Sequence, residues 1–441
     1  MKNILLIAPK SINSNSSEIS LLKTSPSGLL ILATMLRNKG HNVRFIDESF
    51  KIPDYTKIEN LDLVLISSIS ATVNRAYSLA DMFRNRGIKV IMGGIHVSFM
   101  ANEALKHCDQ VVIGEAEEII FDVVEGKFKS KIVRGIPTED LSRYPMPDYS
   151  LVEGMKKEPD VVAVVTSRGC PFACKFCSLV NVFGRKFRSV PTNQIIDYLS
   201  KFKRLRVLAF NEANFTINKE RVIDLLQEMK NNGISPENCM ASVSIDVANN
   251  DRLLKLMRDI SNFTLVIGLE SISQESLDFY NKKQTPETIK ESIKKLHDFG
   301  IKIVGSFIFG ADSDDKSIFQ RTIDFCHSAD IDFPTFTCLT PHVGTALRNE
   351  LELENRIFNN NWDFYDTLHT VFFPQKMSPL ELQEGVLNAY ESVYSTSQIF
   401  NHLKRKEIFK SMQKFHIRRL LKRGIKQHRF YPAYLQDASI S

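Results

Sequence analysis

Three cysteines stand close together in the chain, in a C-x3-C-x2-C pattern formed by Cys170, Cys174 and Cys177. They follow the apolar run 161–165, which predicts a loop at the end of a buried strand. Three thiolates on one loop indicate a metal site, but a structural zinc needs a fourth ligand, and the nearest histidines are far away in sequence. A [4Fe-4S] cluster held by three cysteines would instead leave one iron open to a ligand that is not protein.

With Phe176 placed before the last cysteine, this pattern resembles the signature of the radical S-adenosylmethionine (SAM) enzymes. The resemblance implies that the amino and carboxylate groups of SAM chelate the open iron of a [4Fe-4S] cluster. One electron from the reduced cluster then cleaves the sulfonium and gives a 5′-deoxyadenosyl radical, which takes hydrogen from an unactivated carbon. No catalytic residue is assigned beyond the cluster and its three cysteine ligands.

Strand-length apolar runs alternate with helix-length segments after the cysteine loop as well. The predicted strands lie at 161–165, 206–210, 239–244, 264–268, 303–309 and 336–339. Six such units suit the partial (β/α)6 barrel of the radical SAM family, with the chemistry at the carboxyl ends of the strands. The resemblance implies that SAM is bound by Phe176, Asn211, Glu212, Ala213, Ser244, Glu270 and Gly310. Asn211 replaces one acid of the pair that relatives use for the methionine amino group, so Glu212 is expected to bind more of it.

Residues 1–130 predict a separate doubly wound, Rossmann-like parallel sheet, because short apolar runs alternate there with helix-period stretches. The loops after three of these strands resemble those of the cobalamin-binding domain found in one large branch of radical SAM enzymes. The implied cobalamin-binding residues are Ser67, Thr72, Gly93, Gly94, Ile95, His96, Gly114 and Glu115. The D-x-H-x-x-G motif of the lower cobalt ligand is absent from the sequence, and we expect His96 to pack or hydrogen-bond near the ligand.

The domain organisation follows from these patterns. It comprises a cobalamin-binding-like domain at 1–130, a proline-rich linker at 131–158, a radical SAM barrel at 159–347 and a mostly helical extension at 348–441. The extension resembles that of hopanoid methylases and is rich in aromatic residues at 362–374. These aromatic side chains either close a pocket for an apolar substrate or form core, and the sequence favours neither.

The net charge of +6 is concentrated in the tail, because residues 401–430 contain eleven Lys and Arg against the single acid Glu407. This distribution argues against a nucleic-acid partner for the body of the protein. The tail predicts either a helix packed on the body or a basic amphipathic helix that makes peripheral membrane contact. The scattered remaining cysteines and the lack of a long apolar run or signal-peptide pattern predict a cytoplasmic protein, with membrane association as an option.

The function that the resemblance implies is that of a cobalamin-dependent radical SAM enzyme of the class B methyltransferase-like branch. It would methylate an unactivated carbon through the 5′-deoxyadenosyl radical and methylcobalamin. We expect a small-molecule substrate, with a lipid-like molecule favoured over a peptide or natural-product intermediate, and an external one-electron donor such as flavodoxin or ferredoxin. Two alternatives stay open: a cobalamin-linked radical SAM cyclase or other carbon–carbon bond-forming enzyme, and a non-catalytic iron–sulfur or cobalamin-binding protein.

Overall fold

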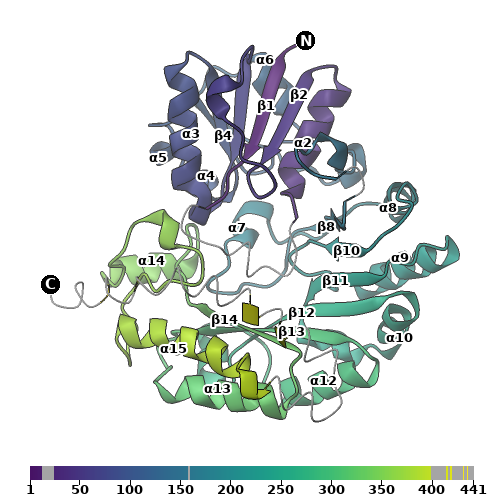
Figure 1. Cartoon of the computed structure of the whole chain (residues 1–441), viewed down its shortest axis with the longest axis vertical. Helices are drawn as coiled ribbons and strands as arrows, with labels where there is room; N and C mark the ends of the chain where they lie inside the picture. Colours follow the sequence, from purple (N-terminus) through teal and green to yellow (C-terminus); the bar gives the residue numbers. More distant parts are fainter. Residues whose placement is uncertain are drawn as a thin grey trace. The chain divides into compact units, whose positions relative to one another are not determined.

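The computed structural model describes residues 1–11, 24–156, 159–398, 414–415, 418–419, 431 and 435 (Figure 1). These residues form two compact units. The first unit comprises the described residues of Met1–Ile12, Leu22–Phe172 and Ser178–Cys239, and the second comprises those of Ala173–Cys177 and Met240–Ser441. Most of the predicted basic tail lies outside the described residues. Among the described helices, none combines the length and the apolarity that crossing a bilayer requires.

A six-stranded parallel sheet with the order β2-β1-β3-β4-β5-β6 forms the core of the first unit's N-terminal part. Its strands are β1 (Asn3–Ala8), β2 (Asn42–Asp47), β3 (Leu63–Ser67), β4 (Lys89–Gly93), β5 (Gln110–Ile113) and β6 (Ile132–Arg134). The strand order reverses between β1 and β3, and ligands of doubly wound sheets bind at the carboxyl ends beside such a reversal. The predicted Rossmann-like sheet is therefore confirmed.

Helices cover both faces of this sheet, with α3 and α5 on one side and α2 on the other (Figure 1). Because both faces are covered, the inner strands are apolar throughout, and Leu5 and Leu6 of β1 are both fully buried. Helix α2 buries Leu30, Ala33 and Leu36, whose spacing places them on one face. The helices are α2 (Ser27–Asn38), α3 (Val73–Asn85), α4 (Ile95–Phe99), α5 (Ala101–Ala104) and α6 (Ile120–Glu125).

The segment predicted as a linker, 131–158, is folded onto this unit over the residues that the structure describes. Its start forms β6, the last strand of the sheet, and two 3-10 turns follow at Leu141–Arg143 and Tyr149–Leu151. The Tyr149 hydroxyl group donates to the Ala163 carbonyl oxygen and accepts from the Ala163 amide, each at 2.8 Å. The segment therefore binds to the strand that leads into the cysteine loop.

The rest of the first unit carries the start of the predicted barrel. Strands β7 (Val161–Val164) and β10 (Val207–Phe210) pair in parallel, and the short strands β8 (Ser167–Arg168) and β9 (Arg188–Ser189) pair antiparallel. The helices are α7 (Leu179–Phe183), α8 (Thr192–Leu199) and α9 (Lys219–Asn231). The β8–β9 pair encloses the segment that contains the cysteine pattern, which fixes the chain at both ends of that segment.

The second unit continues the strand–helix alternation. Strands β12 (Asn262–Glu270), β13 (Lys302–Phe309) and β14 (Phe333–Cys338) are parallel neighbours, and the boundary between the units falls within β11 (Asn238–Val243). The helices are α10 (Asp251–Ile260), α11 (Gln274–Phe279), α12 (Pro286–Asp298), α13 (Ser317–Ser328), α14 (Ala346–Leu353) and α15 (Pro379–Val393). All six strands predicted for the barrel are present, with bounds within a few residues of the prediction.

The outer side of β14 is covered by the C-terminal extension. Phe336 donates its backbone N–H to the Tyr390 hydroxyl at 3.0 Å, and Cys338 donates to the Thr367 carbonyl at 2.8 Å. The Tyr394 hydroxyl donates to the Pro334 carbonyl at 2.9 Å. Hydrogen-bonding groups that a neighbouring strand would otherwise use are thus satisfied by α15 and the loop before it.

Aromatic side chains of the extension are mostly core. Trp362, Tyr365 and Phe372 are buried, and the Arg348 guanidinium lies 4.8 Å from the centre of the Trp362 ring. These three rings are core, whereas Phe364 is half-buried and Phe373 is 39% exposed, so closure of a substrate pocket stays a prediction for those two. Burial of such large rings contributes to the stability of the extension.

Candidate active site

The cysteine loop lies between β8 and α7, and its first part is set by backbone contacts within the first unit. Gly169 has a φ of +87°, and a Cβ atom there would lie 2.0 Å from the Lys186 carbonyl oxygen. Cys170 follows and donates its N–H to the Gly184 carbonyl at 3.2 Å. Only glycine fits at position 169, so the chain enters the cysteine pattern in one conformation.

The second part of the loop, Ala173–Cys177, packs on the end of α11 and the residues after it in the second unit. Lys175 donates its N–H to the Tyr280 carbonyl at 3.3 Å, and Asn281 donates from its side chain to the Ala173 carbonyl at 2.9 Å. The rings of Phe176 and Tyr280 meet edge to face at 5.6 Å. Phe176, which we predicted to bind SAM, therefore also anchors the loop on the segment 279–282.

The donor set of this loop fits an iron–sulfur cluster better than zinc. The thiols of Cys170, Cys174 and Cys177 are all partly exposed, in contrast to the four buried cysteines outside the loop. Across the described ranges, no group of three or more His, Cys, Asp or Glu side chains is arranged as a metal site. Three cysteines on one loop, with no further Cys or His close by in the sequence, would suit a cluster with one open iron, and their role as its ligands stays a prediction.

Glu212, just after β10, has one carboxylate oxygen without a hydrogen-bond partner among the described residues. Thr166 donates to its Oε1 atom at 2.5 Å, while its Oε2 atom is buried without a hydrogen-bond partner among the described residues. Arg221 of α9 donates through Nη2 to the Thr166 carbonyl at 2.9 Å, and its Nε and Nη1 atoms are likewise buried and unpartnered there. Burial raises the pKa of Glu212 to about 7, although the Thr166 hydrogen bond and the Arg221 charge oppose this.

The unpartnered atoms of Glu212 and Arg221 suit the amino acid moiety of SAM. A carboxylate oxygen is suited to an ammonium group and a guanidinium to a carboxylate. Buried polar groups are seldom left unpartnered, so both side chains are ready to receive a charged ligand. Arg221 has no signal in the sequence, where it looks like an ordinary solvent-facing cation on a helix. Asn211 and Ala213, also predicted for SAM, are exposed.

Glu270 ends β12 in a strained backbone conformation. Its φ is +60°, the pairing of β12 with β13 is irregular between Gly268 and Glu270, and its buried carboxylate lies 2.7 Å from the Lys282 ammonium. A Cβ atom at Gly268 would lie 2.3 Å from Glu270 Oε1, so a larger residue there would push the Glu270 carboxylate from its position. Burial lowers the pKa of Lys282, but the charge of Glu270 and the nearby Cys174 and Cys177 raise it overall.

The other two predicted SAM positions of the second unit, Ser244 and Gly310, each directly follow a strand. Ser244 is half-buried and precedes the 3-10 turn Ile245–Asn249. Gly310 has a φ of +109°, and its N–H donates to Asp314 at 3.0 Å. A Cβ atom there would lie 2.9 Å from a methyl carbon of Leu382, so this close approach also requires glycine.

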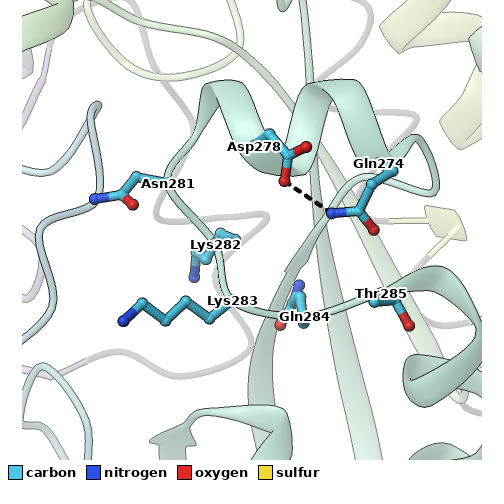
Figure 2. A pocket seen from close by; sticks show the side chains of 7 residues that line it. All are labelled: Gln274, Asp278, Asn281, Lys282, Lys283, Gln284 and Thr285. Carbon is cyan, nitrogen blue, oxygen red and sulfur yellow. Dashed lines mark hydrogen bonds between the residues drawn. The ribbon is translucent and has the colours of Figure 1, made fainter.

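A polar pocket of about 360 Å³ lies beside Lys282 (Figure 2). It is formed by the last turns of α11 and the residues after it, and Gln274 donates to Asp278 at 2.8 Å on its wall. The side chains of Lys282 and Lys283 point to the same side in this view. The complete lining is Gln274, Asp278, Asn281, Lys282, Lys283, Gln284 and Thr285.

The predicted cobalamin residues lie at the carboxyl ends of β3, β4 and β5. Gly94 has a φ of +100°, and a Cβ atom there would lie 2.5 Å from the Ser68 carbonyl oxygen. Ser67 and Gly93 face each other in the register of β3 and β4, and Ile95 begins α4. The Ser68 hydroxyl is buried and has no partner within the part of the chain that the structure describes. Glycines at the carboxyl ends of the strands let a ligand approach the backbone closely, and the Ser68 hydroxyl has no partner among the described residues. Both features fit a bulky bound cofactor such as cobalamin.

His96, Thr72 and Gly114 have local hydrogen-bonding roles at this edge. His96 is buried, with Nδ1 at 3.0 Å from the Ser70 hydroxyl and Nε2 at 3.6 Å from Glu103. The Thr72 hydroxyl accepts from the Ile69 amide at 3.2 Å, and the Ser98 hydroxyl accepts from the Gly114 amide at 3.0 Å. His96 therefore packs and hydrogen-bonds as expected, rather than presenting a nitrogen to solvent.

Glu115, the last predicted cobalamin residue, uses its carboxylate for two arginines. Its Oε2 atom lies 2.7 Å from Arg168, and its Oε1 atom lies 2.5 Å from Arg188. All three side chains belong to the first unit and are nearly fully buried. The loop after β5 is therefore joined directly to both short strands that flank the cysteine segment, a connection that the sequence does not reveal.

Two family models match parts of this chain. Residues 164–326 match the Radical SAM superfamily, and residues 20–124 match the B12 binding domain. The chain is 30% identical to an uncharacterized methyltransferase of Pyrococcus horikoshii, over 84% of this chain and 87% of the relative. It is 29% identical to the bacteriochlorophyllide d C-12(1)-methyltransferase of Chlorobaculum tepidum, over 92% and 90%.

Solved structures of two cobalamin-dependent enzymes have the same fold. The radical SAM methyltransferase TsrM of Kitasatospora setae, with cobalamin and a [4Fe-4S] cluster bound, has a TM-score of 0.67 at 14% identity, covering 89% of this chain and 88% of TsrM. OxsB with aqua-cobalamin and SAM bound has a TM-score of 0.70 at 13% identity, covering 94% and 72%. The chain belongs to the radical SAM superfamily, in the cobalamin-dependent branch that joins a B12 binding domain to the radical SAM domain and includes methyltransferases.

Proposed function

We propose that this chain methylates an unactivated carbon of a small molecule in a cobalamin-dependent radical SAM reaction. The observation that carries the proposal is the contact of Glu115 with Arg168 and Arg188, which joins the loop after β5 to the segment that contains the cysteines. A reaction that uses both cofactors on one substrate needs their binding loops to be held together. When bound, the cluster, SAM and cobalamin supply the electron, the hydrogen-abstracting radical and the methyl carrier.

The side chains of the protein bind and orient these groups. Cys170, Cys174 and Cys177 would ligate the cluster. Glu212 would accept hydrogen bonds from the SAM ammonium group, and Arg221 would bind the carboxylate. The burial of Glu212 excludes water from the ammonium group and strengthens its electrostatic interaction.

Glu270 would accept hydrogen bonds from the ribose hydroxyl groups, with Ser244 and the Gly310 backbone close to the nucleoside. The Lys282 ammonium holds the Glu270 carboxylate in place at 2.7 Å. At the carboxyl ends of the first sheet, Ser67, Thr72, Gly93, Gly94, Ile95, His96 and Gly114 would shape the cobalamin site.

The test is anaerobic purification followed by reconstitution with iron, sulfide, cobalamin and SAM. The wild type should form 5′-deoxyadenosine when reduced, and Cys174→Ala should form none. Cys108→Ala, which removes a buried thiol outside the loop, is the matched control and should retain the activity. If Cys174→Ala still produced 5′-deoxyadenosine, the assignment of the cluster would be wrong.

Formation of S-adenosylhomocysteine separates methylation from other radical reactions. A methylase should produce one S-adenosylhomocysteine for each methylated product, because a second SAM supplies the methyl group. A cyclase would produce 5′-deoxyadenosine without it. Both products should be measured, because the chain is also 26% identical to an anaerobic magnesium-protoporphyrin IX monomethyl ester cyclase of Cereibacter sphaeroides.

We infer that the substrate is a largely apolar, lipid-like or tetrapyrrole molecule. Relatives include the two bacteriochlorophyllide d methyltransferases and a hopanoid C-2 methylase. Incubation with bacteriochlorophyllide and hopanoid substrates and methyl-labelled SAM would detect transfer by mass. A flavodoxin or ferredoxin is the proposed electron donor, in a reducing cytoplasm. Membrane contact through the basic tail stays a prediction, because most of that segment lies outside the described residues.

A further inference from the structure

A buried network of four charged side chains lies within the first unit. The Glu115 carboxylate binds Arg168 at 2.7 Å and Arg188 at 2.5 and 3.1 Å, and Arg168 also pairs with Glu117. The exposed fractions of these side chains are 2% for Glu115, 5% for Arg188 and Glu117, and 9% for Arg168. Buried charges are tolerated only when they are paired and hydrogen-bonded, and this network is balanced at two acids and two bases.

Arg188 makes two further hydrogen bonds. Its guanidinium donates to the Thr138 carbonyl at 2.7 Å and to the Phe183 carbonyl at 2.9 Å. Phe183 is the last residue of α7, so Arg188 also holds the end of the helix that follows the cysteines. One arginine thus connects the loop after β5, the segment after β6 and the end of α7.

The position of the network in the sequence gives it a role beyond stability. Glu115 directly follows Gly114, at the cobalamin side of the first sheet. Arg168 precedes Cys170 by two residues, and Arg188 pairs with Arg168 in the register of β8 and β9. The network therefore spans from the cobalamin loop to both ends of the segment that carries the cluster ligands.

We propose that Glu115 is a positioning residue that couples cobalamin binding to cluster binding. A shift of the loop after β5 on cobalamin binding must move or strain Arg168 and Arg188, because both are bonded to Glu115 and their charges cannot be left unpaired in the interior. A shift of the cysteine segment on cluster binding would likewise move Arg168 and Arg188 and, through Glu115, the loop after β5. This inference rests on the proposed function only in that both cofactors bind the chain.

The test compares cobalamin affinity in two forms of the full-length chain. Hydroxocobalamin is titrated anaerobically into cluster-loaded protein and into protein freed of iron, with its absorbance as the readout. Coupled sites change each other's affinity by a common factor, and we expect the cluster-loaded wild type to bind about fivefold more tightly or better. In Glu115→Gln this ratio should fall towards one.

Two further variants keep the test decisive. Glu139→Gln removes an exposed carboxylate that pairs with Lys186 of the same segment at 2.5 Å, and it should keep the wild-type ratio. If Glu115→Gln does not fold, Arg188→Lys replaces it, because a lysine keeps the positive charge but lacks the guanidinium that bonds to both Glu115 oxygens and to the Thr138 carbonyl. Equal affinities in the two forms of the wild type, or a wild-type ratio in folded Glu115→Gln or Arg188→Lys, would overturn the coupling. A wild type that methylates its substrate but shows equal affinities would reject the coupling and leave the proposed function intact.

Discussion

Thr166 donates its hydroxyl hydrogen to Glu212 at 2.5 Å, and this one bond fixes the carboxylate while its second oxygen stays available. Thr166 is the residue before β8, and Glu212 comes two residues after the end of β10. The pair therefore joins the two chain segments that leave the neighbouring strands β7 and β10. A carboxylate held in this way needs no reorientation when an ammonium group arrives.

Glu212→Gln should weaken SAM binding by about 10- to 100-fold, because it removes a charge-assisted hydrogen bond worth roughly 1.5–3 kcal/mol. The absorption and EPR spectra of the cluster should not change. Equilibrium binding of SAM to reconstituted protein measures the effect. Glu220→Gln, an exposed acid in the first turn of α9, is the control and should bind SAM like the wild type.

SAM affinity should rise with pH between about 6 and 8. Burial raises the pKa of Glu212 to about 7, so the carboxyl group is largely protonated at the lower end of this range and accepts poorly from an ammonium group. Binding measured at constant ionic strength would show the rise in the wild type and not in Glu212→Gln. Parallel pH profiles in the two proteins would assign the titration to another group.

The stability of the cofactor-free protein should fall over a related range. The pKa of Glu212 is higher in the folded chain than the ordinary value of 4.5, so the folded state binds more protons between pH 4.5 and 7. The stabilisation that the raised pKa of Glu212 contributes is complete below pH 4.5 and is lost as the pH rises through 7. The difference in thermal midpoint between the wild type and Glu212→Gln, measured from pH 4.5 to 8, isolates this contribution. A difference that does not vary with pH would contradict it.

Lys282→Met should destabilise the protein by about 3 kcal/mol, because it leaves the buried Glu270 carboxylate without its counter-ion. Denaturant unfolding of the cofactor-free protein measures the loss. Lys283→Met is the matched control, since Lys283 is an exposed neighbour in the same pocket, and should change stability by less than about 0.5 kcal/mol. Equal effects of the two substitutions would show that the Glu270 contact does not matter.

Gly94→Ala should reduce cobalamin affinity and stability together. The added Cβ atom would lie 2.5 Å from the Ser68 carbonyl, so the loop after β4 must move, at a cost of about 2 kcal/mol or more. Gly87→Ala tests the backbone strain alone, because Gly87 also has a positive φ of +75° but nothing within 4 Å of its Cβ position. The Gly87 variant should bind cobalamin normally.

The strands could be predicted from the sequence because parallel strands covered on both faces read as unbroken apolar runs, as in β1 and β3. The same apolar runs place Glu212 and Glu270 at strand ends, whereas their role in SAM binding is implied by the resemblance and stays a prediction. Strand β6 was missed because Ile132–Arg134 is too short to show a pattern. It lies in a proline-rich stretch that has the composition of a linker.

The ionic contacts could not be predicted in this way. Arg188 and Glu115 are 73 positions apart, and no periodicity connects them. Arg221 and Lys282 look in the sequence like ordinary surface cations, and only the folded chain shows that Lys282 pairs with the buried Glu270 and that Arg221 donates to the Thr166 carbonyl. A charged residue near a strand end can therefore be proposed as functional from sequence, whereas the residue that holds it in place requires the structure.

Tyr390 of α15 and Tyr394, directly after this helix, also affect how copies of this chain can associate. The end strand of a parallel sheet exposes a row of backbone donors and acceptors on which a strand of another molecule can form. On β14 these groups at Pro334, Phe336 and Cys338 already bond to Tyr394, Tyr390 and Thr367. Self-association by strand addition, and the fibrils that can grow from it, is therefore blocked at this edge unless α15 is first displaced.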